Sequence, residues 1–509
     1  MTAEAQPWSR GLTRFRRCVT DVVGRWGIRG ILLVTLGLVI RLLLAPWTTS
    51  VDITNLLGGL VAFRYTGHPY LGYVYSYPPV PVMIDGPLFL GLSYFVPPYS
   101  WFTFSTSAQQ LFTLTGGVSP LVPTPLFSLV VKAPLIFADF LTAFAIYKIA
   151  GAMGLSRRVA QTGFLLYWLS PLTIFESAVH APVDSMVPAL VLLFAYGIQS
   201  QRPFYAGLGA ALGVFTIFFP SLLVVLGFSF YGTRFLLLSQ ERHASLRQLA
   251  GFATGLAVPV IIFLPVLTSF LYLNQTLLGG AGFTQCVCGD TFWGLANNSW
   301  GWLRASLAPP IYDNLQAIGL GLRVFDVALA ILLGVWLASM TDRATRRPPP
   351  FATYAIVLGF LSVLLLSTTG VNPQYFLWPF SVLIVAGFGF TYLHKFVLPI
   401  GILAVIGEVA IQGPFVFLIP LSVYTGVIPG STIVRLTTDY WLDAWGPFAP
   451  WYMWNVVAVF GGILLTAIAY WSLRYGWELA TSPQARSPSP QVGPPGSAVR
   501  APDPVHQSG

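Results

Sequence analysis

Long apolar runs with very few charges recur along the whole chain and constrain its fold more than any other feature. A helix needs roughly 20 consecutive apolar residues to cross the hydrocarbon core of a bilayer. Only 8% of the 509 residues are charged, against about 25% in a soluble domain. The sequence therefore predicts an all-α, polytopic membrane bundle and excludes a soluble nucleic-acid-binding protein. The runs lie near 31–47, 127–149, 159–176, 183–200, 246–272, 318–340, 351–369, 375–393, 396–412 and 451–472.

A further apolar run, 204–231, is too long for one span and too short for two full ones. Pro220 interrupts this run, and proline removes a backbone hydrogen bond from a helix. We therefore expect two short or tilted helices here. With them, the predicted bundle has about twelve spans.

The basic residues indicate how the spans are oriented. Short cytoplasmic loops carry more Lys and Arg than external loops do. Most of the 26 basic residues lie in the N-terminal segment, in alternate loops and near the C-terminus, which predicts that both termini are cytoplasmic. The segments 48–126, 273–316 and 413–450 are then external loops. Arg greatly outnumbers Lys, a composition typical of GC-rich prokaryotes, so the expected location is a prokaryotic cell membrane.

Two segments depart from the pattern of simple spans. The apolar stretch 80–96 contains Asp85 and Pro87 and is expected to lie as a helix on the outer membrane surface. The alternative is that it spans and reverses every later helix. Residues 481–509 are rich in Ser, Pro and Gly without an apolar pattern, which predicts a disordered cytoplasmic tail. The preceding residues, 1–480, form the predicted membrane domain.

Polar and aromatic motifs gather at the predicted external ends of the spans. The first motif runs from Asp52 through an aromatic-x-Gly-x-Pro-Tyr sequence to a Tyr-Pro-Pro sequence, and it includes Tyr65, His68, Tyr70 and Tyr77. Later motifs each contain two chemically active residues. They are Lys132 with Asp139, His180 with Asp184, and Gln374 with Tyr375.

In this order the motifs resemble those of GT-C class integral-membrane glycosyltransferases, and in particular polyprenyl-phosphate-mannose-dependent mannosyltransferases. The resemblance covers roughly residues 30–230 and 365–380. It implies external juxtamembrane helices and transfer of a sugar, with inversion, from polyprenyl phosphate to a glycan, lipid or protein acceptor outside the cell. It also implies no cofactor and no metal ion. The chain departs from the family pattern at Ala181-Pro182, where relatives have Gly-Gln, and at Ile217, where relatives often have Lys.

The resemblance also implies a role for each motif residue. Asp52 would be the catalytic base that deprotonates the acceptor hydroxyl. Lys132 would bind the donor phosphate. Arg41 and Arg323 also lie near the outer ends of predicted spans and are alternative phosphate ligands. The expected substrate-binding residues are Tyr65, His68, Tyr70, Tyr77, His180, Asp184, Gln374 and Tyr375.

Each candidate also has an ordinary structural explanation. Asp52 and Asp184 can be helix N-caps, Lys132 can extend toward the lipid headgroups, and Tyr375 can belong to an aromatic belt. Two other functions stay open: a transporter or lipid flippase, and a catalytically silent subunit with the same fold. A transporter would carry ionisable residues near the bilayer midplane, whereas most acids are predicted to lie outside.

Overall fold

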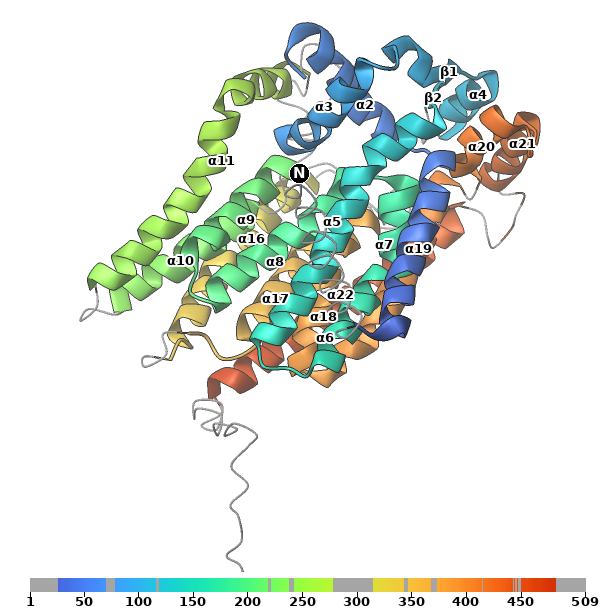
Figure 1. The fold of residues 1–509 in the computed structure, drawn as a ribbon. Helices are drawn as coiled ribbons and strands as arrows, with labels where there is room; N and C mark the ends of the chain where they lie inside the picture. Colours follow the sequence, from blue (N-terminus) through green and yellow to red (C-terminus); the bar gives the residue numbers. More distant parts are fainter. Residues whose placement is uncertain are drawn as a thin grey trace, which may run out of the picture.

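The computed structural model of the protein describes residues 26–69, 78–115, 119–217, 221–237, 242–277, 315–342, 347–367, 373–413, 415–442, 444, 446 and 450–481. The structure is mostly helical, which confirms the predicted class in its coarse form (Figure 1). The all-α prediction needs one correction. Strands β1 (Phe102–Phe104) and β2 (Leu121–Pro123) pair as a short antiparallel ladder, because an aromatic Phe-Thr-Phe sequence favours extended backbone.

Four helices are long and apolar enough to cross a membrane, judged by length and composition. The first helix, Trp26–Trp47, ends in the 3-10 turn η1 (Ala45–Trp47). The others are α5 (Pro125–Ala152), α11 (Arg242–Leu277) and α19 (Thr391–Gln412). These helices are consistent with a membrane protein.

Several other predicted spans are shorter than expected, so a bundle of twelve full-length spans is not confirmed. Helices α9 (Pro203–Thr216) and α10 (Ser221–Leu237) are the two short helices predicted for 204–231. A rise of 1.5 Å per residue gives the 14 residues of α9 a length of roughly 21 Å. That is less than the ~30 Å hydrocarbon core of a bilayer.

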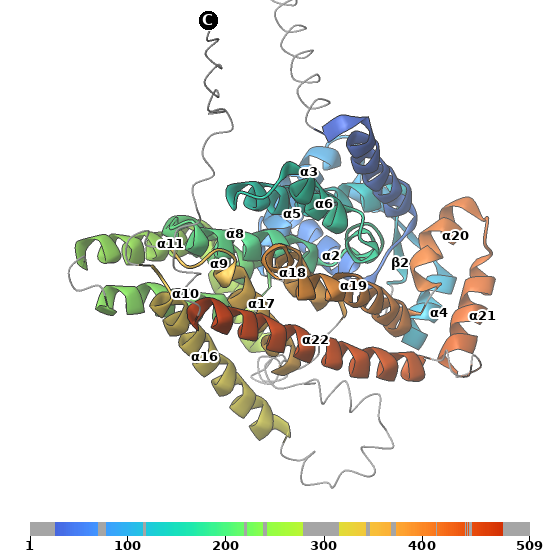
Figure 2. The same cartoon turned by 90° about the horizontal axis from the view of Figure 1, so that it is seen from below.

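The centre of the bundle consists of α17 (Ala352–Ser367) and α18 (Leu377–Gly389), which are buried along almost their whole length. Helices α5 and α6 (Arg157–Trp168) contact α18, and four further helices pack against the pair, as the view from below shows (Figure 2). They are α8 (Val187–Gln199), α16 (Leu315–Ser339), α19 and α22 (Pro450–Thr481). The central pair carries no charged residue, which fits an apolar core.

The predicted external segments 48–126 and 413–450 lie at the same end of the bundle (Figure 1). The first contains α2 (Val51–Thr66), α3 (Pro79–Ser93), η2 (Pro98–Trp101) and α4 (Thr106–Thr115). The second contains η7 (Val416–Leu418), α20 (Ile419–Thr425) and α21 (Gly430–Trp441). Helix α4 packs on α21, and the Tyr424 hydroxyl donates to the Val122 carbonyl at 3.0 Å. The two segments therefore form one layer over the bundle.

Candidate functional site

The buried polar side chains converge on one irregular helical segment. After α6 (Arg157–Trp168), Pro171 begins α7 (Pro171–Ile174), which continues as a π-helical turn, η3 (Phe175–His180). The Ala181 N–H donates to the carbonyl of Glu176, five residues earlier, at 2.7 Å. Ala181 itself has a φ of 62° and ends the helix. Such π turns are rare and often lie at functional sites.

Lys132, on α5, joins the ends of two helical segments. Its buried Nζ lies 3.2 and 2.8 Å from the carbonyl oxygens of Ala45 and Thr48, at the end of the first helix. It also lies 2.9 and 3.2 Å from the carbonyls of Ala178 and Val179, in the last turn of η3. Carbonyls at a helix C-terminus lack intrahelical donors and carry partial negative charge. The ammonium group therefore stabilises both helix ends at once.

This geometry bears on two interpretations of Lys132. The side chain is fully buried, so it does not extend toward lipid headgroups. Its ammonium group already contacts four carbonyls and the hydroxyl of Thr48. A donor phosphate would have to compete with these five acceptors, and phosphate binding by Lys132 stays a prediction.

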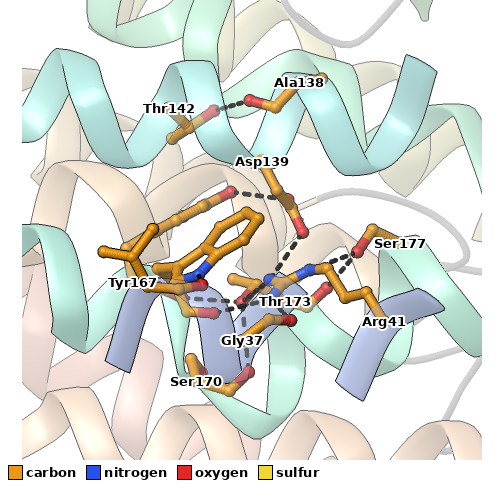
Figure 3. A network of polar contacts seen from close by, with 11 residues as sticks. Gly37, Arg41, Ala138, Asp139, Thr142, Tyr167, Ser170, Thr173 and Ser177 are labelled. Atoms are coloured by element: carbon orange, nitrogen blue, oxygen red, sulfur yellow. Dashed lines mark hydrogen bonds and ion pairs between the residues drawn. The ribbon is translucent and has the colours of Figure 1, made fainter. Parts of the chain in front are cut away.

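Arg41, on the first helix, forms a second buried network (Figure 3). Its guanidinium pairs with Asp139 of α5 at 3.0 Å, and both side chains are fully buried. It donates to the hydroxyls of Thr173, in α7, and Ser177, in η3, at 3.0 and 3.1 Å. It also lies 4.0 Å from the centre of the Trp168 ring and donates to two backbone carbonyls. Asp139 and Lys132 share one sequence motif, but the ion pair of Asp139 is with Arg41.

The structure describes the side chain of only one of the two alternative phosphate ligands. The N–H groups of Arg41 point to protein acceptors (Figure 3), so its phosphate role stays a prediction. Arg323 belongs to α16, and its side chain lies outside the part of the chain that the structure describes.

A third buried group connects η3 to α19. Nδ1 of His180 lies 3.1 Å from Oε2 of Glu176 and 3.4 Å from Oε2 of Glu408. All three side chains are buried, and one donor atom from each lies within 4.8 Å of the others. His180 is a predicted site residue, whereas its two acidic neighbours, Glu176 and Glu408, are not. The available signal was an acid inside an apolar run, which is functional or paired by default.

Asp184, in η4 (Val183–Met186), extends this group to η6 (Pro373–Phe376). Its two carboxylate oxygens accept hydrogen bonds from Nε2 of Gln374 at 2.8 Å and Nε1 of Trp378 at 3.1 Å. The backbone N–H of Gln374 donates to Oε1 of Glu408 at 2.8 Å. The structure thus brings together three predicted site residues: Asp184, Gln374 and, through Glu408, His180.

The surroundings of these residues correct the sequence prediction. Asp184 was expected to face external water and is fully buried, while Gln374 is 6% exposed rather than at the water boundary. Tyr375 is half-buried and stacks on Trp378, which is itself buried, with ring centroids 4.7 Å apart. A carboxylate can leave water where charged hydrogen bonds replace its hydration. Here an indole and an amide far along the chain supply those bonds.

Asp52 lies in the first turn of α2, and the N-cap of this helix is Ser50. The explanation of Asp52 as the N-cap is therefore wrong. The Ser50 hydroxyl donates to the His180 carbonyl at 2.5 Å, and the Thr48 hydroxyl donates to the Ala178 carbonyl at 2.9 Å. The chain that leads into Asp52 is thus tied to η3, although the Asp52 side chain lies outside the described structure.

Among the remaining aromatic candidates, Tyr65 lies far from this place. Residues 51–66 form one continuous helix rather than a loop. At 1.5 Å per residue, Tyr65 lies roughly 20 Å along the axis from Asp52. Tyr65 is 67% exposed, and His68 follows the helix end. Tyr70 and Tyr77 lie outside the described residues.

The three buried networks share η3. Its side chains contact Arg41 and Glu408, its last carbonyls contact Lys132, and its final carbonyl holds the N-cap of α2. The arrangement fixes the start of the segment 48–126 on a buried polar framework. No protein-family model matches the chain, and no curated protein matches it.

Proposed function

We propose that this protein is a membrane glycosyltransferase of the GT-C type that uses a polyprenyl-phosphate sugar as donor. The sugar is a hexose such as mannose, and the acceptor is a glycan, lipid or protein outside the cell. The proposal includes a bundle of about twelve spans, several of them short or tilted. Both termini are cytoplasmic, in a prokaryotic cell membrane.

The observation that supports the proposal is the meeting of distant motifs around η3. Four motifs were selected from separate parts of the sequence. They are the segment that precedes Asp52, the helix that carries Lys132, the His180–Asp184 junction and Gln374. In the structure they are linked by consecutive hydrogen bonds.

The proposed reaction is a single displacement. The acceptor hydroxyl oxygen attacks the anomeric carbon, and the bond from that carbon to the phosphate oxygen breaks. Polyprenyl phosphate leaves with the bonding electron pair, and the hydroxyl proton passes to the Asp52 carboxylate. A base must lie within hydrogen-bond reach of that proton, so the anchoring of Thr48 and Ser50 on η3 would hold α2 in place for the reaction.

The test is a transfer assay with the full-length protein in membranes and radiolabelled polyprenyl-phosphate mannose, glucose and arabinose as separate donors. Asp52→Asn keeps the size of the side chain and removes its basicity. Because a positioned base contributes roughly 10²–10⁴ in rate, the variant should lose transfer by two orders of magnitude or more. Asp439→Asn, on the half-buried face of α21, is the matched control and should transfer normally. Transfer by Asp52→Asn at the wild-type rate would remove Asp52 as the base.

One observation favours a second candidate function, a transporter or lipid flippase. More ionisable side chains are buried among the apolar helices than the sequence predicted, and Arg41, Lys132, Glu176 and Asp184 join Asp139 in this group. Ionisable residues inside a bundle can line a translocation path. Reconstitution in liposomes separates the two functions, because a flippase moves a labelled lipid-phosphate sugar between leaflets and leaves its glycosidic bond intact. A catalytically silent subunit would do neither.

A further inference from the structure

Glu176, His180 and Glu408 form the group of potential metal ligands that the described residues contain. One imidazole nitrogen and two carboxylate oxygens come from two different elements, η3 and α19. All three side chains are buried. Acidic side chains rarely gather out of water without a cation or a proton between them.

The distances from the His180 nitrogen to the two carboxylates fit a small divalent cation. Nitrogen and oxygen ligands lie about 2.0–2.2 Å from Zn²⁺. When two donors are each at that distance from the ion, they lie about 3.0 Å apart if the donor–metal–donor angle is a right angle. They lie about 3.4 Å apart if that angle is tetrahedral. Nδ1 of His180 lies 3.1 and 3.4 Å from the nearest oxygens of Glu176 and Glu408.

The surroundings orient these donors in the way that metal ligands usually require. Ligating carboxylates are normally held by further hydrogen bonds, and the second oxygen of Glu408 accepts from the Gln374 backbone N–H at 2.8 Å. The Gln374 side chain is itself fixed on Asp184. The Phe417 ring packs edge-on against the His180 ring at 6.1 Å, which limits access of water.

We infer that Glu176, His180 and Glu408 bind a first-row divalent cation, Zn²⁺ or Mn²⁺, which links η3 to α19. The mixed donor set favours these ions, because imidazole suits Zn²⁺ and carboxylates suit Mn²⁺. Binding displaces the protons that lie between the donors in the metal-free protein. The inference does not depend on sugar transfer, since it concerns the joining of two helical segments.

The test measures bound metal directly. The full-length protein is purified in detergent, its metal content is determined by mass spectrometry, and Zn²⁺ or Mn²⁺ alone is then added after treatment with a chelator. The wild type should bind a single ion with a rise in its unfolding temperature. Glu176→Gln and Glu408→Gln keep shape and hydrogen bonding but lose a charged ligand, and each should bind at least ~10-fold more weakly.

Glu478→Gln is the control, because Glu478 is half-exposed in an ion pair with Arg474 on α22. This variant should bind metal as the wild type does. Wild-type protein that holds no Zn²⁺ or Mn²⁺ after purification and after addition overturns the inference, even where a glutamine variant does not fold. Equal binding by the wild type and both glutamine variants overturns it as well. Loss of transfer activity alone has no bearing on either outcome.

Discussion

Breaking the Arg41–Asp139 ion pair should destabilise the protein more when the arginine is removed than when the aspartate is removed. Both side chains are fully buried, and the paired atoms lie 3.0 Å apart. The asymmetry follows from what each partner keeps. Without Asp139, Arg41 still donates to two hydroxyls and two carbonyls. Without Arg41, the Asp139 carboxylate keeps the hydrogen bond from the Tyr167 hydroxyl, which lies 3.4 Å away.

The magnitude follows from the cost of a buried, uncompensated charge. Removal of one partner of a buried pair costs about 3–5 kcal/mol of folding free energy. Asp139→Leu should lie near the lower end, since four hydrogen bonds still solvate the guanidinium. Arg41→Met should lie near the upper end. The double variant leaves no buried charge in this place, and it should lose less than the sum of the single variants by about 3 kcal/mol.

The assay is a double-mutant cycle on the full-length protein, with the free energy of unfolding measured in mixed micelles. The Arg474–Glu478 pair is the control, because its atoms also lie 3.0 Å apart while its side chains are about half-exposed. Exposed pairs contribute at most about 1 kcal/mol. Losses at Arg41 and Asp139 that add within ~0.5 kcal/mol would show that the pair is not coupled. A smaller loss for Arg41→Met than for Asp139→Leu would refute the argument from remaining partners.

Two further predictions concern single buried charges. Lys132→Ala leaves the carbonyls at two helix ends without their donor. In unfolding measurements without donor lipid, this variant should lower the free energy of unfolding by at least ~1–3 kcal/mol. An unchanged stability would leave phosphate binding as the only role for Lys132. Asp85, on α3, is 2% exposed, and neither of its carboxylate oxygens has a hydrogen-bond partner among the described residues. Burial raises the pKa of its carboxyl well above the ordinary value. Because the folded state then prefers the protonated form, stability falls as pH rises above the ordinary carboxyl pKa. Asp85→Asn should therefore stabilise the protein by about 1–3 kcal/mol near neutral pH and flatten its pH dependence; a less stable variant in thermal unfolding at neutral pH would contradict this.

Local patterns were sufficient to predict the helical class and the burial of Asp139. The apolar run that contains Lys132 and Asp139 predicts a helix. Because charges are rare in such runs, both residues are expected to be paired or functional. Pro220 likewise predicted that 204–231 would fold as two helices, which α9 and α10 confirm. These inferences need only the residues of one helix.

Partners could not be predicted, because they depend on packing between distant segments. Asp184 and Gln374 are 190 residues apart, and no local pattern says that one will hold the other out of water. The same limitation applied to Asp139, whose partner Arg41 lies on a different helix. For this reason the prediction that the Asp184 side chain faces water was wrong. Helix length was less predictable than helix position, since tertiary packing determines where each short helix ends.

The π turn gives a physical reason why three polar networks meet at η3. The helix ends at Ala181, and the next residue, Pro182, has no N–H to donate to the carbonyl of Ala178. The carbonyls of Ala178 and Val179 therefore need donors from elsewhere, since an unsatisfied backbone group in a membrane interior costs several kcal/mol. Lys132 supplies them at 2.9 and 3.2 Å. A buried lysine is thus a consequence of an irregular helix end.

The end of η3 also holds the segment that leads to the candidate base, Asp52. The His180 carbonyl, last in the turn, accepts its hydrogen bond from Ser50, the N-cap of α2. Ser50, which donates to the last carbonyl of η3, is therefore also the residue at which α2 begins, two residues before Asp52. A change in η3 that restores regular α-helical bonding would remove the acceptor of Ser50 and release the first turn of α2. The position of the first turn of α2, which contains Asp52, therefore depends on the irregular bonding at the end of η3.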